Sequence, residues 1–426
     1  MILTQFKITD VRAREIIDGR GTPTVEVDIW VDSFLRGRAD VPSGRSTGSH
    51  EACEIRDGGS RYGGLGVRTA VDNVNRLIAP AVIGHDVTQQ RYLDSLMKEL
   101  DGTPQKSKLG ANAMVGVSLA AAKAAASSLG TPLYKYINSN SHTLPVPMMN
   151  LINGGKLASN DLDFQEFIIM PVGAASFSQA LEITNEVNSK LGKILLKRYG
   201  KLALNVGDEG GYVPPITSIR EALDVLQQAV RETEWESTIV YALDVAATHL
   251  YDKNTQKYII EGGQMSVEEL IDLYKELVSS YPIVSIEDPL DENDFEGFAR
   301  ITQKLGIQVV GDDLFVTNSE RLRKGIETGA ANALLWKVNQ IGTLSEALDT
   351  AELAFRNRYG VVVSERSGET EDSAIADFAV ALDAGQIKTG APVRAERTCK
   401  YNQLLRIEEE LGSSARYAGR KFNQSY

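Results

Sequence analysis

The chain has few of the residues on which several classes of protein depend. Its 426 residues include two cysteines, Cys53 and Cys399, and four histidines. Two cysteines cannot form the disulfide framework of a small secreted domain, and neither lies in a CxxC or other metal-ligand spacing. With so little thiolate and imidazole, a zinc centre is not expected. The cysteines are expected to pack as small apolar residues in a reducing compartment, so the expected location is the cytoplasm.

Long apolar runs and an excess of positive charge are also missing. No run approaches the roughly 18 apolar residues that predict a membrane-spanning helix, and residues 1–10 lack the pattern of a signal peptide. Lysine and arginine number 45 against 57 aspartates and glutamates, which gives a net charge of -12. An acidic surface disfavours contact with nucleic-acid phosphates. We therefore expect neither a membrane nor a nucleic acid as partner, and instead a small substrate in a locally basic pocket.

Two successive patterns predict two domains. A composition that is 42% hydrophobic and 24% charged is sufficient for a full core. Residues 1–140 have an α+β pattern, with strand-like alternation in TPTVEVDIWVD and an alanine-rich helical stretch near 109–129. Residues 141–426 alternate short apolar strands with amphipathic helices, which is typical of a parallel β/α barrel. The expected fold is α/β, a (β/α)8 TIM-like barrel with a smaller N-terminal α+β capping domain.

A charged residue directly follows the apolar run of six predicted barrel strands. These residues are Asp244, Glu287, Asp312, Lys337, Glu365 and Lys388. A single charge is costly to bury, but the carboxyl ends of parallel barrel strands open onto one mouth, where the charges can balance one another. Any single one of these charged residues could simply mark the point at which its strand emerges from the core, without a functional role. Six in succession favour a shared site.

The charges at these strand ends indicate a particular chemistry. Three carboxylates without clustered histidine or cysteine predict a hard cation with oxygen ligands, Mg²⁺, held by Asp244, Glu287 and Asp312. A lysine that faces such a site suits removal of a proton next to a substrate carboxylate, because the cation stabilises the charge that forms. Lys337 is the candidate base. Nearby cations are expected to lower its pKa toward the working range.

Two further acidic motifs precede the strands that carry these carboxylates. Glu209 lies in NVGDEGG and Glu166 in DFQEF. The glycines beside Glu209 allow the backbone to approach a ligand closely. Two carboxyl groups near a leaving hydroxyl could supply the general acid of a β-elimination. Each motif taken alone is more often an ordinary loop acid.

Long blocks of the chain resemble the enolases, in the same order and over essentially its whole length. They include DGRGTPTVEV, PVPMMNLINGG, SIEDPLDENDFEGF, LLWKVNQIGTLSE and GQIKTGAP. The resemblance implies a glycolytic hydro-lyase, phosphopyruvate hydratase, that converts 2-phospho-D-glycerate into phosphoenolpyruvate. It also implies two Mg²⁺ ions, the second bound together with substrate, and a homodimer or higher homo-oligomer. Magnesium with a lysine base is the known arrangement of enolase-superfamily sites and is not a new prediction.

The resemblance also implies roles for individual residues. The matches to catalytic and metal-binding positions are Lys337 as the base, Glu209 as the general acid, Glu166 as its carboxylate partner, Asp244, Glu287 and Asp312 as ligands of the first ion, and Ser46 as the loop serine that closes over the second. The matches to substrate-binding positions are Lys388 for the substrate carboxylate, Arg366 and Ser367 for the phosphate, and Gln165 beside the general acid's partner.

Three positions of the expected site depart from the family pattern. Arg45 replaces a small residue of SGAST, Leu157 replaces the histidine of NGGxH, and Glu365 replaces the histidine of SHRSGET. A negative charge at Glu365 would repel a phosphorylated carboxylate. Arg45 could pair with Glu365, or it could bind phosphate in place of the missing histidine; both are candidate substrate-binding residues. We predict that the two side chains lie at salt-bridge distance in at least one state of the loop. The alternatives to an unchanged substrate are a related phosphorylated or phosphonate carboxylate, or a binding protein with little or no catalysis.

Overall fold

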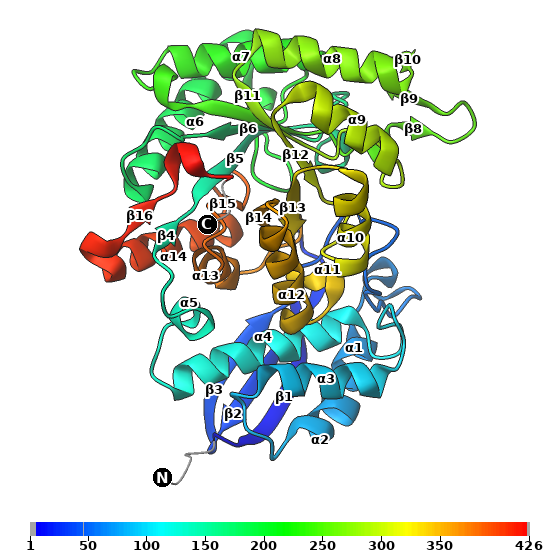
Figure 1. Cartoon of the computed structure of the whole chain (residues 1–426), viewed down its shortest axis with the longest axis vertical. Helices are drawn as coiled ribbons and strands as arrows, with labels where there is room; N and C mark the ends of the chain where they lie inside the picture. The colour runs from blue at the N-terminus through cyan, green and yellow to red at the C-terminus, as the bar shows by residue number, and fades with distance from the viewer. Residues whose placement is uncertain (1–5, 46, 424–426) are drawn as a thin grey trace.

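The computed structural model describes residues 6–45 and 47–423, with an N-terminal domain (blue and cyan) below a barrel in Figure 1. An antiparallel sheet in the order β1-β2-β3 opens the N-terminal domain. Its strands are β1 (Ile8–Ile17), β2 (Pro23–Val31) and β3 (Phe34–Asp40). The helices that follow are α1 (Arg68–Asn73), α2 (Ala79–Val82), α3 (Gln90–Asp101), α4 (Ala111–Ser128) and α5 (Leu133–Ile137).

Helix α4 lies directly on this sheet because small residues line both surfaces. Most of the buried residues of α4 are alanine or valine. A Cβ added at Gly37 of β3 would come within 2.1 Å of the Ala120 carbonyl oxygen. Glycine at this position therefore permits the close approach of helix and strand, and a larger residue would push them apart.

The second part of the chain closes into an eight-stranded barrel, as the alternating pattern predicts. The strands follow one another around the barrel as β5 (Val146–Asn153), β6 (Glu166–Met170), β7 (Val240–Asp244), β11 (Ile283–Glu287), β12 (Gln308–Gly311), β13 (Ala333–Trp336), β14 (Gly360–Ser364) and β15 (Gln386–Lys388). The outer helices are α6 (Phe177–Tyr199), α7 (Ile219–Arg231), α8 (Val267–Ser280), α9 (Phe295–Leu305), α10 (Ser319–Thr328), α11 (Val338–Ile341), α12 (Leu344–Arg356), α13 (Ala374–Ala381) and α14 (Ala395–Leu411).

One strand departs from the parallel arrangement that the sequence predicts. Strand β6 runs antiparallel to both of its neighbours, β5 and β7. The segment between β5 and β6 contains only a short 3₁₀ turn, Gly155–Leu157, and a parallel pair needs a longer crossover connection. The direction of β6 places its first residue, rather than its last, at the mouth of the barrel where the other strands end.

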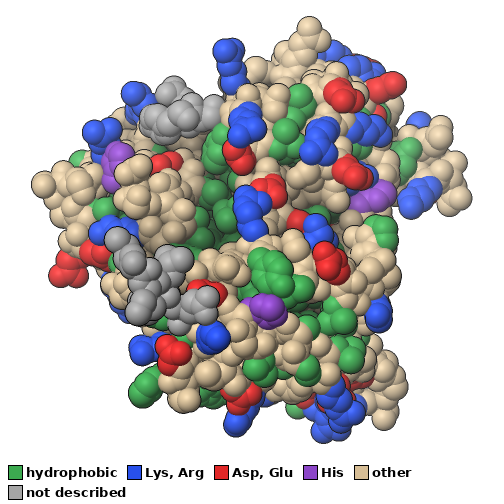
Figure 2. All heavy atoms as spheres, turned by 60° about the horizontal axis from the view of Figure 1, so that its bottom comes forward, with side chains coloured by type: hydrophobic (Ala, Val, Ile, Leu, Met, Phe, Trp, Pro, Cys, Tyr) green, Lys and Arg blue, Asp and Glu red, His purple; other side chains and the backbone are tan. Residues whose placement is uncertain are grey.

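Short strands complete the structure outside the barrel. They are β4 (Thr143–Leu144), β8 (Tyr251–Asp252), β9 (Lys257–Ile260), β10 (Gly263–Met265) and β16 (Arg416–Tyr417). Acidic and basic side chains are interspersed over the face seen in Figure 2. Within residues 6–45 and 47–423, no helix has both the length and the apolar character needed to cross a membrane.

Two apolar clusters correspond to the two sides of the barrel wall. One cluster gathers alternate strand residues, including Met148, Ile168, Val310 and Leu335, together with Phe422 near the chain's end. The intervening strand residues pack against the helices in the other, larger cluster. Because strand side chains alternate between faces, the first cluster fills the barrel interior and leaves the mouth for polar residues.

The contact between α5, α13 and α14 contains a carboxyl group whose titration should be measurable. Asp377 of α13 accepts hydrogen bonds from the Tyr134 amide (3.3 Å) and from Gln403 (3.2 Å). Burial raises the pKa of Asp377 to about 6. The folded protein therefore retains a proton that the unfolded chain releases near pH 4, and stability is lost as the pH rises from about 4 through 6.

Asp377→Asn removes this ionisation while keeping the shape of the side chain. We expect the stability of the variant relative to wild type to increase between pH 4 and 7, by up to about 3 kcal/mol, and then to stay constant. Thermal melts of both proteins over this pH range measure the difference. The exposed Asp272→Asn serves as the control and should show no such trend. A wild-type and Asp377→Asn difference that is the same at every pH would contradict the assignment.

Candidate active site

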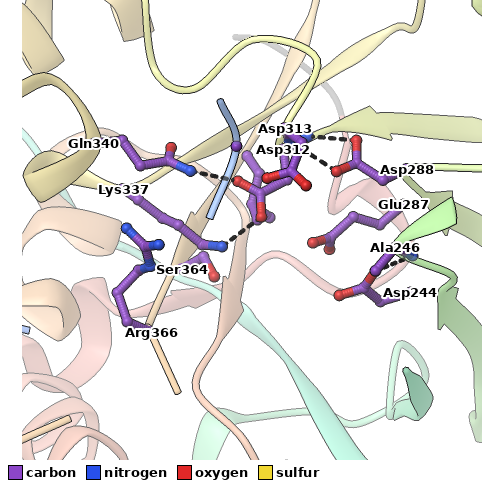
Figure 3. Close-up of polar contacts among 12 residues, drawn as sticks. Asp244, Ala246, Glu287, Asp288, Asp312, Asp313, Lys337, Gln340, Ser364 and Arg366 are labelled. Atoms are coloured by element: carbon purple, nitrogen blue, oxygen red, sulfur yellow. Dashed lines mark hydrogen bonds and ion pairs between the residues drawn. The ribbon is translucent and has the colours of Figure 1, made fainter. Parts of the chain in front are cut away.

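The barrel mouth collects the charged residues that follow the strands. Asp244, Glu287 and Lys388 are the last residues of their strands, while Asp312, Lys337 and Glu365 come directly after theirs. Glu166 joins them from the start of antiparallel β6, where it pairs in register with Asp244. Figure 3 shows four members of this group, Asp244, Glu287, Asp312 and Lys337, turned toward one another.

Lys388 lies among three buried carboxylates at the centre of the group. Its Nζ is 2.9 Å from an oxygen of each of Glu166, Asp244 and Glu287. Burial would lower the pKa of Lys388, but the three carboxylates raise it well above its ordinary value. Burial raises the pKa of Glu287 in turn, against the lowering effect of this lysine. One ammonium group therefore balances only part of the negative charge of the three carboxylates.

Lys337 and Gln340 hold the remaining predicted carboxylate ligand. The Lys337 Nζ is 2.5 Å from Asp312 Oδ2, and the Gln340 side-chain amide donates to Asp312 Oδ1 at 2.7 Å. The expected lowering of the Lys337 pKa is wrong for this arrangement. Burial, Arg366 and Lys388 act to lower it, but Asp312 and Glu287 outweigh them and the pKa of Lys337 is raised.

The predicted ligands fit a hard cation by their chemistry, although they are not gathered around one point. Asp244 and Glu287 both face Lys388, which occupies the position of a cation between them. The carboxylate oxygens that lie within 4.8 Å of one another are those of Asp288, Asp312 and Asp313. Buried Glu166 Oε2 also has no hydrogen-bond partner among the described residues. This donor set of oxygens suits Mg²⁺ once the lysines release their carboxylates.

Asp288 has a structural role that the sequence does not reveal. Its two carboxylate oxygens accept hydrogen bonds from the backbone amides of Asp312 (2.9 Å) and Asp313 (2.7 Å), as Figure 3 shows. This fixes the turn that carries Asp312. In the sequence, Asp288 is only a second acidic residue directly after Glu287. An acidic residue at such a position is equally consistent with a surface loop.

Glu209 and Glu166, the predicted general acid and its carboxylate partner, line the same cavity. Asn150 of β5 donates from its side chain to Glu209 Oε2 at 3.1 Å and so orients that carboxyl group. Burial and the neighbouring Glu209 raise the pKa of Glu166 well above its ordinary value. The protonated form of Glu166 is therefore favoured. Gln165 lies next to the pair and donates to Asp244 Oδ2 at 3.1 Å.

The N-terminal domain contributes to the side of the mouth formed by Arg366 and Ser367. Glu51 makes two contacts with the Arg366 guanidinium, both at 3.0 Å. The Ser367 hydroxyl accepts from the Arg45 amide at 2.8 Å and from the Arg20 side chain at 3.1 Å. Sequence reasoning missed Glu51 and Arg20, because their contacts join segments more than 300 residues apart. The predicted ligand Ser46 lies outside the described residues.

The three departures from the family pattern are accommodated separately. Arg45 Nε pairs with Asp208 Oδ2 at 3.0 Å, and Glu365 pairs with the buried Arg397, so the expected ion pair between Arg45 and Glu365 is not formed in this structure. Burial raises the pKa of Glu365 above its ordinary value, while the contact with the Arg397 guanidinium favours the charged carboxylate. Leu157 is buried, and its carbonyl accepts from the Asp208 amide at 3.2 Å.

One small cavity connects these groups. Its walls include Glu166, Glu209, Lys337 and Lys388, together with Gln165, Asp244, Ser364, Glu365, Arg366 and Ser367. Its volume of about 10 Å³ is close to the minimum that holds one water molecule. Entry of a larger ligand therefore requires movement of the side chains that line the cavity.

Comparison with known proteins gives matches along nearly the whole chain. The family model "Enolase, N-terminal domain" matches residues 8–137, and "Enolase, C-terminal TIM barrel domain" matches residues 141–426. A relative called Enolase from Methanocaldococcus jannaschii is 62% identical over 98% of each chain. Relatives of the same name from Thermococcus kodakarensis and Pyrococcus furiosus are 60% and 59% identical over 99% of each chain.

Lys388→Met should expose the mutual repulsion of the carboxylates. Without a divalent cation, we expect the variant to lose about 3–5 kcal/mol of stability, because removing one partner leaves buried charges uncompensated. Added Mg²⁺ should raise its melting temperature more than that of wild type, since the cation replaces the ammonium group. The control Lys135→Met breaks the exposed pair with Glu410 and should cost less than about 1 kcal/mol. Equal melting of the two variants, or equal responses to Mg²⁺, would contradict this account.

Proposed function

Because the chain belongs to the enolase family, we propose that it is a phosphopyruvate hydratase, the glycolytic hydro-lyase that dehydrates 2-phospho-D-glycerate to phosphoenolpyruvate. One observation carries the proposal: a single buried cavity is lined by a lysine, a pair of carboxyl groups and an arginine–serine pair. These are the groups needed to remove a proton, to protonate a leaving hydroxyl and to hold a phosphate. The relatives do not favour the altered-substrate and non-catalytic alternatives.

The reaction divides between two sets of residues in the cavity. Lys337 Nζ takes the proton from C2 of the substrate, and the electrons of the broken C–H bond form the new double bond between C2 and C3. The C3–O bond breaks, and Glu209, supported by Glu166, gives its proton to the departing hydroxyl, which leaves as water. Lys388 binds the substrate carboxylate, with Gln165 beside it, and Arg366 and Ser367 bind the phosphate.

Lys337 can accept a proton only as a neutral amine. Its contact with Asp312 favours the charged form in the arrangement described here. The lysine must therefore separate from Asp312 before it acts as the base. Once it does, burial and the nearby Arg366 and Lys388 all favour the neutral amine.

We assign the first Mg²⁺ to Asp244, Glu287 and Asp312, and the second to Ser46, where it binds together with substrate. When bound, Mg²⁺ supplies positive charge that stabilises the negative charge gained by the substrate carboxylate on proton removal. The oxygen-only donors of the barrel mouth support this choice of metal. Arg45 and Glu365 are proposed as residues at the edge of the substrate, with Arg45 nearest the phosphate through its contact with Ser367.

We further propose that the protein works as a homodimer or higher homo-oligomer in the cytoplasm. Both expectations come from the resemblance and from the composition of the chain. Sedimentation velocity measures the mass of the assembly. A species with the mass of one chain, at the concentration used in the activity assay, would contradict the proposed oligomer.

Purified protein with Mg²⁺ and 2-phospho-D-glycerate should produce the absorbance of the enol product. Lys337→Ala should lower kcat by about 10³-fold, because a general base contributes roughly 10²–10⁴-fold. Lys135→Ala, a change at a partly exposed lysine that does not line the cavity, should leave kcat unchanged. No turnover of 2-phospho-D-glycerate by wild type would sink the proposal. Turnover of a phosphonate or another phospho-hydroxy acid instead would identify the altered substrate.

A further inference from the structure

Arg397, on the first turn of α14, reaches into two loops of the barrel mouth. Its side chain is fully buried. One terminal nitrogen donates to the Arg366 carbonyl at 2.7 Å and to the Glu365 carboxylate. The other donates to the Ser367 carbonyl at 2.5 Å and to the Asp208 carbonyl at 3.0 Å. A single guanidinium group therefore joins the segment after β14 to the segment that contains Asp208.

The two segments joined by Arg397 carry different parts of the proposed chemistry. Glu209, the proposed general acid, directly follows Asp208. Arg366 and Ser367, the proposed phosphate ligands, are the residues whose carbonyl groups Arg397 binds. At Arg366, Ser367 and Asp208 the partner is a backbone carbonyl, so Arg397 fixes the path of the loop and leaves the side chains of these residues free. None of its four partners lies more than one residue from a proposed site residue.

A third segment is packed between these two. Gly390 follows β15, and its φ of +78° lies in the left-handed region that favours glycine. A Cβ at Gly390 would lie 2.6 Å from the Glu209 carbonyl oxygen and 2.9 Å from Glu365 Oε1. The amide of Ala391 donates to the same Glu209 carbonyl at 2.9 Å. The loops therefore touch one another, and a shift in one displaces the others.

The geometry requires arginine at this position rather than any cation. A guanidinium group has several donors in one rigid plane, whereas a lysine ammonium acts as a point charge on a flexible stem. Three of the four contacts are to carbonyl oxygens, which carry no net charge. Glu365 is the carboxylate in closest contact with the buried guanidinium, and Glu396 Oε1 lies 3.9 Å from Arg397 Nε. This pairing also explains how the chain places a glutamate where the family pattern has histidine.

We propose that Arg397 is a positioning residue that holds the Glu209 segment in register with the Arg366–Ser367 segment, and that Glu365 is its buried counter-ion. The proposal rests on the proposed function for the roles of Glu209, Arg366 and Ser367. The competing explanation is that Arg397 only neutralises Glu365. That explanation requires a positive charge but not the contacts to three backbone carbonyls.

Arg397→Lys separates the two explanations, because it keeps the charge beside Glu365 and loses the planar set of donors. We expect kcat to fall by about 100-fold, more than KM rises, because small misplacements of catalytic groups have effects of this size. Hydrogen exchange of the amides in residues 207–210 and 365–368 should become about tenfold faster. Arg397→Met should show the same changes to a larger extent.

Lys123→Met is the matched control for loss of a partly buried ion pair. Lys123 of α4 contacts both oxygens of Asp372, at 2.6 and 2.5 Å, away from the cavity. The Lys123→Met variant should be less stable than wild type, but its kcat and the hydrogen exchange of residues 207–210 and 365–368 should not change. If Arg397→Met does not fold, Gly390→Ala tests the same packing, because its Cβ would displace the Glu209 segment while Arg397 remains.

Wild-type kcat and wild-type exchange in Arg397→Lys would overturn the proposal and leave charge balance as the sole role. Equal loosening of the two segments in Lys123→Met would also overturn it, since the effect would then be general destabilisation. Failure of wild type to turn over 2-phospho-D-glycerate is a different outcome. It would reject the proposed function, whereas the exchange measurements, which need no substrate, would still report on Arg397.

Discussion

The arrangement of the barrel mouth depends on the compensation of buried negative charge. Glu166, Asp244 and Glu287 would repel one another strongly without a cation, because the surrounding protein screens charge poorly. Lys388 supplies that cation through three contacts of 2.9 Å. Lys337 does the same for Asp312. The lysines therefore hold the carboxylates in place and supply the positive charge beside them.

Two features outside the parallel strands complete this mouth. Strand β6 runs against its neighbours, and its reversed direction brings Glu166 beside Asp244. The N-terminal domain supplies Glu51 to Arg366 and Arg20 to Ser367. Because these contacts cross between the two parts of the chain, the proposed phosphate-binding side depends on how the N-terminal domain packs on the barrel.

The sequence predicts the barrel and its charged mouth because both follow from local patterns. A charge after an apolar strand is visible in a few residues, and the geometry of a barrel brings such residues together. The reversal of β6 was not predicted, since its cue is a connection without a long helix, which looks like any other loop. The raised pKa of Lys337 was not predicted, because the direction of the shift depends on whether Asp312 or the cationic Arg366 and Lys388 act more strongly on the Lys337 amine.

The remaining differences arise from contacts between distant segments. Arg45 and Glu365 were expected to form a pair, and each instead has another partner, Asp208 and Arg397. Nothing in the spacing of these residues indicates such a choice, because it is set by where α14 and the Asp208 segment lie in the folded chain. Asp288 and Asn150 were missed for the same reason: their partners are the backbone turn after β12 and the carboxyl group of Glu209, which lies in a turn distant in the sequence.

At the barrel mouth, Mg²⁺ and lysine are proposed to share the same carboxylates. Calorimetric titration of Mg²⁺ into the wild-type protein and into Glu287→Gln, with circular dichroism to verify folding, tests it most directly. The account predicts saturable binding to wild type and loss of that binding in the variant, because one proposed ligand and one contact of Lys388 are removed together. Unchanged Mg²⁺ affinity in a folded Glu287→Gln protein would contradict it.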